Sequence, residues 1–233
     1  MKSKILSTAI IASSILFSAS CSNKAGSGST SATDSTSATK TTEQTSGTST
    51  KKYDIKSAIV SYSTETMGMK NSQMLYFDDF GAKERLETIT EIEMMGVKSR
   101  TVTVSITKDG YKYDYELENT TNKGNIAKKE IKKRKAIISP SADMGNMATT
   151  MTDEMKKQYE YKEEGTETVA GVTGKKFSMM IGKTKFTGVI YKKIPVKTEM
   201  EMVKIIAQKF EENASIPSDK FELPKDYTIV EVQ

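Results

Sequence analysis

The chain has 233 residues, a formal charge of +5 and no histidine or tryptophan. Without histidine it lacks the most common general base, proton shuttle and metal ligand. Charges of both signs are interspersed, which does not favour the clustered basic face of a nucleic-acid-binding protein. The paired carboxylates Asp78 and Asp79 lie at a predicted turn, where aspartate bonds its own backbone. We therefore expect a binding or structural protein, not an enzyme, with no metal and no cofactor.

The first twenty residues read as an export signal. Lys2 and Lys4 precede an apolar run over residues 5–17, which is too short to span a bilayer, and residues 18–20 are small. The only cysteine, Cys21, follows directly. This arrangement resembles the lipobox of bacterial lipoproteins, although Ser18 stands where that family usually has leucine. The alternative is an ordinary cleaved signal with an incidental free cysteine.

The lipobox resemblance implies a location. It implies that Cys21 carries a diacylglycerol on its thiol and an acyl group on its new amino terminus, enough for stable membrane anchoring. Ser22 follows the cysteine, and in Gram-negative lipoproteins the absence of aspartate there implies the outer membrane. We expect a cell-envelope protein anchored by lipid, with the folded part facing the periplasm.

Three segments are expected along the chain. Residues 1–20 are the signal peptide, and residues 21–50 combine the lipidated cysteine with a low-complexity tether of Ser, Thr, Gly and Ala that has almost nothing to bury. Residues 51–233 are the folded domain.

Alternating apolar and polar residues dominate the folded segment. Val102, Val104 and Ile106 alternate with hydroxyl residues, and a row of tyrosines alternates with charges over 111–118. The Asp-Gly pair at 109–110 joins these two runs as a hairpin signal. Further strands are predicted over residues 57–66, 73–78, 83–94, 166–172, 175–181, 186–191, 196–206 and 227–232.

The short connections predict the fold class. Successive strands joined by a few turn residues become antiparallel neighbours. We therefore expect a mainly β (α+β) domain: one meandering, strongly curved antiparallel sheet or incomplete barrel, lidded by one or two helices.

One helix is predicted after Ser139-Pro140. Its apolar positions recur at helical spacing and are rich in methionine: Met144, Met147, Ala148, Met151, Met155 and Tyr159. Methionine is flexible and adapts to variable apolar shapes. This stripe either fills an ordinary core or forms the lid of an apolar cleft.

The densest basic run covers residues 127–135. It reads either as the solvated side of a strand or turn or as a contact for anionic lipid or another polyanion. Residues 217–224 carry prolines at both ends, which predicts a loop or single turn that tucks Phe221 and Leu223 inward.

Three stretches resemble a known group. "YDIKSAIVSYSTETMGMKNSQMLYFDDFG" (53–81), "IYKKIPVKTEM" (190–200) and "ENASIPSDKFELPKDYTIVEV" (212–232) are similar to an uncharacterised branch of the superfamily of periplasmic lipoprotein carriers and outer-membrane lipoprotein receptors. The resemblance implies a bent sheet whose concave side is lidded by helices and holds acyl chains. The carriers use an arginine in that cavity, and the motifs do not place Arg85, Arg100 or Arg134 on it.

Two functions follow as hypotheses. The first is a binding module for a lipid, acyl chain or lipidated peptide on the concave face of the sheet. Its candidate ligand-binding residues are Met74, Tyr76, Val102, Val104, Met144, Met147, Met151, Met155 and Met179. The second is a structural or interaction lipoprotein with the same fold packed solid, which recruits an envelope partner through the basic run or the strand edges.

Overall fold

The computed structural model describes residues 51–66, 69–94, 96–121, 124–125, 127–136 and 151–232. The predicted signal peptide, Cys21, the tether and most of the predicted helix, with Met144 and Met147, lie outside the described residues.

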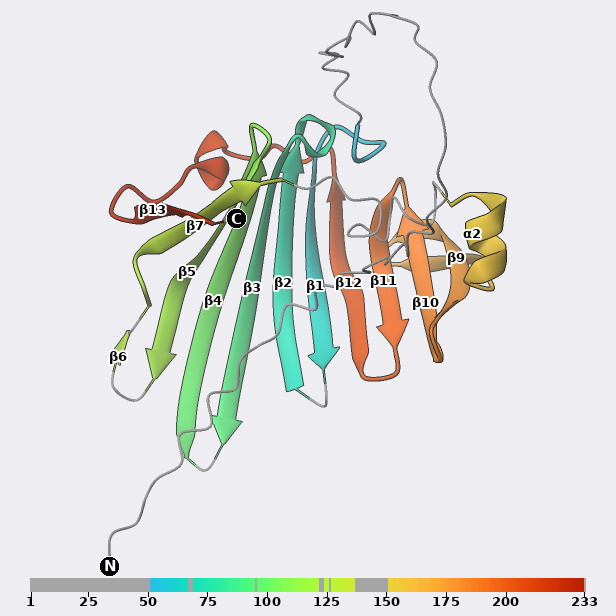
Figure 1. The fold of residues 1–233 in the computed structure, drawn as a ribbon, viewed down its shortest axis with the longest axis horizontal. Coiled ribbons are helices and arrows are strands. Elements are labelled where there is room, and N and C mark those ends of the chain that lie inside the picture. The colour runs from blue at the N-terminus through green and yellow to red at the C-terminus, as the bar shows by residue number, and fades with distance from the viewer. Residues whose placement is uncertain are drawn as a thin grey trace, which may run out of the picture. The chain divides into compact units, whose positions relative to one another are not determined.

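The described residues form one large, curved, open sheet of 13 strands with very few helices, which confirms the predicted fold class (Figure 1). The first strands are β1 (Ala58–Thr66), β2 (Met69–Asp78), β3 (Lys83–Met94), β4 (Val97–Lys108), β5 (Tyr111–Thr121), β6 (Gly124–Asn125) and β7 (Glu130–Lys135). The later strands are β8 (Lys162–Val169), β9 (Val172–Ile181), β10 (Thr184–Tyr191), β11 (Ile194–Met200), β12 (Val203–Glu212) and β13 (Thr228–Glu231). Two single 3-10 turns, η1 (Asp79–Gly81) and η2 (Ser218–Phe221), and the helix α2 (Asp153–Gln158) complete the described elements.

The strand order is β13-β7-β5-β4-β3-β2-β1-β12-β11-β10-β9-β8, with β6 beside β5. Neighbours in sequence are mostly neighbours in the sheet, as short links require. The expectation of one continuous meander is wrong at two places: β12 returns to pair with β1, and β13 pairs with β7 in parallel. Both pairings join segments far apart in the chain, which local turn signals cannot reveal.

In the described part of the chain, three two-residue hairpin turns have the positive φ at both positions that a type I′ turn requires, and one of them, Lys192–Lys193 between β10 and β11, uses no glycine. Asp109 and Gly110 have φ of 52° and 75°, as the Asp-Gly signal predicts. Ala170 and Gly171 have φ of 50° and 82°, so the β8–β9 turn uses the first of two available glycines. The predicted single strand over 196–206 is instead β11 and β12, joined by a turn at residues 201–202. This turn contains no Gly, Pro, Asn or Asp, so the local sequence gives no turn signal at that position.

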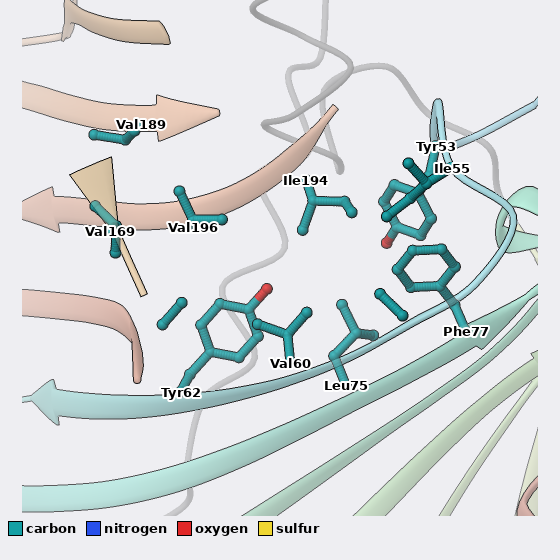
Figure 2. Packing of buried hydrophobic residues seen from close by; sticks show 12 residues of the cluster. Tyr53, Ile55, Val60, Tyr62, Leu75, Phe77, Val169, Val189, Ile194 and Val196 are labelled. Atoms are coloured by element: carbon teal, nitrogen blue, oxygen red, sulfur yellow. The ribbon is translucent and has the colours of Figure 1, made fainter. Parts of the chain in front are cut away.

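Apolar side chains fill the inside of the bend. In Figure 2, Val60 and Tyr62 of β1 and Leu75 of β2 point toward Ile194 and Val196 of β11. Val60, Ile194 and Val196 have no solvent exposure. At one end of this core the ring of Tyr53 lies on Phe77, with centroids 4.2 Å apart. The interior of the bend is therefore packed by the sheet itself and the segment that precedes β1.

The C-terminal segment covers the opposite face of β3–β7. Val104, Ile106 and Ile131 are buried there with two tyrosines of β5, and Leu223 and Tyr227 pack on them. Tyr227 Oη donates to the carbonyl of Glu116 at 2.9 Å. Phe221 is buried, as the proline-bracketed turn predicts.

Arg85 lies beneath this C-terminal segment and not inside the bend. Its Nη1 donates to Tyr115 Oη and to the carbonyl of Lys220, both at 3.2 Å, and its Nε donates to Glu87 at 2.6 Å. Burial, above all, raises the pKa of Tyr115. Arg85 therefore ties η2 to the sheet.

Candidate ligand site beneath helix α2

An apolar floor lies on the β9–β10 hairpin. Phe177 and Met179 of β9 and Phe186 of β10 are almost fully buried. Met179 pairs with Phe186 across the two strands, and Phe177 is two residues from Met179, so all three lie on one face. The ring centroids of Phe177 and Phe186 are 5.8 Å apart. The strand alternation thus produces a continuous patch of soft and aromatic side chains.

Residues 151–161 form a lid over this floor. Met151 is buried in the same cluster, and Met155, Tyr159 and Tyr161 pack partly against it. The Thr152 side chain caps α2 by accepting from the Met155 N–H at 3.3 Å. The six-residue helix has no buried residue of its own.

Besides this packing, one backbone hydrogen bond and one ring contact join the lid to β9 among the described residues. The Met180 N–H donates to the Tyr159 carbonyl at 2.7 Å, and the Tyr161 ring stacks on Phe177 with centroids 5.5 Å apart. Burial, above all, raises the pKa of Tyr161. The lid lies outside the strand ladder, and Tyr161 leads directly into β8.

A pocket of about 200 Å³ opens beside the lid. It is lined by Glu160, Lys162, Glu164, Ser178, Met179, Met180 and Lys185. Met179 belongs both to this pocket and to the apolar floor. The pocket therefore has a charged rim and an apolar base that continues under the lid.

The rim carries charges of both signs. Hydrogen bonding with the Ser178 hydroxyl, together with the positive charges of Lys185 and Lys176, lowers the pKa of Glu164. Lys185 Nζ lies 3.7 Å from the Glu164 carboxylate. Lys162 is exposed and makes no ion pair within the described part of the chain. Two lysines, Lys162 and Lys185, and two glutamates, Glu160 and Glu164, therefore line the pocket.

A second pocket, of about 340 Å³, lies between β8 and β12. Glu167 and Lys197 line it and form an ion pair of 2.9 Å with each other. Because its main charges satisfy one another, it makes a weaker candidate site than the pocket beside the lid.

The predicted ligand-binding residues lie in two places. Met151, Met155 and Met179 come together under and in the lid. Met74 pairs with Glu87, which pairs with Val104, and Tyr76 pairs with Arg85, so these residues share the face under the C-terminal segment. Val102 lies on that face as well, paired with Ile89. The structure therefore does not join Met74, Tyr76, Val102 and Val104 to the methionines of the lid.

Sequence reasoning missed the aromatic floor and the rim. The methionine periodicity directed attention to the helix, whereas Phe177 and Phe186 looked like ordinary strand residues. The alternation in "KFSMMI" already places Phe177 and Met179 on one face. The rim residues Lys162 and Lys185 lie outside the predicted strands 166–172 and 186–191, whereas β8 and β10 begin earlier, at Lys162 and Thr184.

The described residues contain no group of three or more His, Cys, Asp or Glu side chains that could hold a metal ion. Within the same residues, no helix is both long and apolar enough to cross a membrane.

The chain matches no protein-family model and no curated protein. Similar solved structures include an uncharacterized conserved protein from Thermus thermophilus, at 7% identity over 76% of this chain and 91% of that one, with a TM-score of 0.47. They also include the MucA/MucB complex of Pseudomonas aeruginosa, at 13% identity over 76% of this chain and 58% of that one, with a TM-score of 0.40. A DUF1329 family protein from Desulfovibrio piger ATCC 29098 has 11% identity over 73% of this chain and 90% of that one, with a TM-score of 0.21. At TM-scores below 0.5, nothing about this chain's ligand or partner follows from them.

Proposed function

We propose that the protein is a lipid-anchored envelope protein that binds an amphiphile, such as a lipid or a lipidated peptide, beneath the lid of residues 151–161. It is a binding protein and not an enzyme. The apolar chain replaces Met151 and Met155 on the floor of Phe177, Met179 and Phe186. The headgroup lies at the rim, beside Lys162 and Lys185.

One observation carries the proposal: Met179 belongs both to the charged-rimmed pocket and to the buried apolar floor. Ligand sites typically combine an apolar lining with a few polar groups that orient the ligand. Methionines adapt to different chain shapes because their side chains are unbranched and flexible. The pocket is smaller than usual ligand sites of about 300–1,000 Å³, so binding requires the lid to move.

The anchoring part of the proposal rests on the sequence. Lys2, Lys4, the apolar run and Cys21 form a lipobox-like leader, and Ser22 favours the outer membrane. The folded domain would face the periplasm on its tether, within reach of lipids in the same leaflet.

The floor is tested by titrating the chain carrying Cys21→Ser with a fluorescent fatty acid. Met179→Gln should weaken binding by about tenfold or more, because an amide would be buried without a partner on the apolar floor. The matched control is Met202→Gln, which replaces a methionine that is 57% exposed at the β11–β12 turn. Binding by the control should equal that of the parent protein.

The rim gives a second test that does not disturb the core. The exposed pair Lys162→Glu and Lys185→Glu should weaken binding of the fatty acid and strengthen binding of an alkylamine of equal chain length. The matched control is Lys183→Glu in the exposed β9–β10 turn. Absence of saturable binding by the parent protein, or binding unaffected by both sets of changes, would contradict the proposal.

The second candidate is an interaction lipoprotein without a ligand. It is favoured by the solid packing inside the bend, where Val60, Ile194 and Val196 have no solvent exposure. The same fatty-acid titration separates the two, because a purely structural domain would show no saturable binding.

A further inference from the structure

The two edges of the sheet are protected very differently. The β8 edge begins with three charged residues, contains Gly165 at φ 85° and is interrupted by a register shift between Glu163 and Thr166. Charges, glycine and bulges are the usual devices that stop an edge strand from pairing with other chains. β13, with only four residues, contains no glycine and no bulge, and its only charged residue is the final Glu231.

The outer side of β13 presents unpaired backbone groups. The N–H group of Thr228 donates to the carbonyl of Lys129, directly before β7, and that of Val232 donates to the carbonyl of Lys133 in β7, both at 2.9 Å. Because backbone groups alternate sides along a strand, the N–H and C=O of Ile229 and Glu231 face away from β7. Within the described chain, β7 is the only strand that pairs with β13.

Apolar side chains stand exposed along the same edge. Ile229, Val230 and Val232 are 51%, 41% and 36% exposed and make up three of the five exposed large hydrophobic residues of the described chain. Because side chains alternate along a strand, Ile229 lies on one face and Val230 and Val232 on the other. Exposed apolar side chains on an open strand edge are typical of a site for strand addition.

The charges around this edge that have no ion-pair partner among the described residues are mostly positive, and the exposed Glu130 of β7, opposite Thr228, is an exception. Asp226 is bound by Lys129 at 2.6 Å and Glu231 by Lys133 at 3.0 Å. Lys128, Lys132, Lys135 and Lys225 are exposed or half-buried and have no ion-pair partner among the described residues. An acidic partner would find complementary charge here, whereas a second copy would bring the same positive charges to the contact.

We propose that the β13 edge binds an extended, acidic segment of another protein by strand addition. The partner's backbone bonds to the outward groups of Ile229 and Glu231. Its apolar side chains pack on Ile229, and its carboxylates lie on the opposite face, where Lys132 pairs with Val230. This site is separate from the ligand site beneath α2 and does not depend on it.

The test uses the full chain carrying Cys21→Ser and a labelled peptide of alternating valine and glutamate. Fluorescence anisotropy should show saturable binding that weakens with salt, and a valine–lysine peptide should not bind. Ile229→Pro removes an outward N–H but no hydrogen bond to β7, so binding should fall by about tenfold or more. Ile229→Ala is the matched control: it shortens the same side chain but keeps the N–H, so the fall in binding is measured relative to this variant.

A second variant, which changes only a surface charge, tests the proposal even if proline at position 229 disturbs β13. Lys132→Glu should weaken binding of the valine–glutamate peptide and permit binding of the valine–lysine peptide, while circular dichroism and the urea midpoint remain those of the parent.

Three binding results would overturn the proposal. They are equal binding of the two peptides, no saturable binding of either, and full binding by both Ile229→Pro and Lys132→Glu. Self-association that Ile229→Pro abolishes, measured by sedimentation, would also overturn it, since the occupant would then be a second copy.

Discussion

Gly188 is the position where a single added carbon would disturb the proposed site most directly. A Cβ there would lie 2.6 Å from two ring atoms of Phe177 and 3.3 Å from Phe186. The glycine therefore makes room for the aromatic floor. Its φ is not in the left-handed region, so the constraint is one of space and not of backbone conformation.

Gly188→Ala should lower the free energy of unfolding by about 1–3 kcal/mol, the usual cost of overpacking a core. The measurement is urea denaturation. In a Phe177→Leu background the added methyl should cost less, because the smaller side chain yields the space. An equal cost in both backgrounds would show that Phe177 does not define the space at Gly188.

Residue chemistry also explains where the β8–β9 turn falls. Gly171 supplies the left-handed turn position, whereas a Cβ on Gly174 would meet the Ile190 carbonyl oxygen at 2.7 Å. Both glycines in "VAGVTG" look like turn signals. Only the position of β10 shows that Gly174 lies within a strand and permits close approach of its neighbour.

At the scale of elements, one glutamate, Glu167 of β8, links three strands by charge because it pairs with Lys197 of β11 and Lys176 of β9. Lys197 Nζ of β11 lies 2.9 Å from Glu167 of β8 and 3.2 Å from Glu199 of its own strand, and Glu167 also pairs with Lys176 of β9 at 3.4 Å. The hydrogen bond from Lys197 is the main reason that the pKa of Glu167 is lowered.

This pair should make stability depend on pH. A carboxylate with a lowered pKa stabilises the fold above its unfolded pKa of about 4.3, and the contribution is lost as pH falls through the lower folded value. Lys197→Met should therefore reduce the loss of stability between about pH 5 and pH 3, an effect of about 0.5–1 kcal/mol for a partly exposed pair. The measurement is urea denaturation across that range.

Lys98→Met is the control for this prediction, because its ion pair with Glu93 has side chains that are 73% and 66% exposed. Its stability should follow the parent protein at every pH. A Lys197→Met profile with the parent's slope would contradict the role assigned to Glu167.

Alternation identified most strands but not their faces. Leu117 continues the apolar side of the tyrosine row in the sequence, yet it is 44% exposed. A register shift between Val102 and Thr103 places an extra residue in β5 at this point. An extra residue in one strand interrupts the alternation of faces at that point, so Leu117 is not buried with the tyrosines. The local sequence contains no signal for this bulge.

At the scale of the whole molecule, membrane attachment should depend on one sulfur. Cys21→Ser removes the thiol that a lipoprotein leader would acylate. The parent protein should fractionate with membranes and carry the mass of its acyl chains, whereas the variant should leave the membrane fraction. Membrane attachment that persists in the variant would contradict lipid anchoring through Cys21.

The sequence by itself determined the β class and the Asp109–Gly110 hairpin, because alternation and turn chemistry are local properties of the chain. It also placed Met151, Met155 and Met179 among the candidate site residues. Only the tertiary structure decided that β12 pairs with β1 and β13 with β7, and that Val104 lies on a different face from Val60. Pairing of distant strands and the choice of covered face depend on how the curved sheet buries its apolar surfaces, and alternation looks the same on either face.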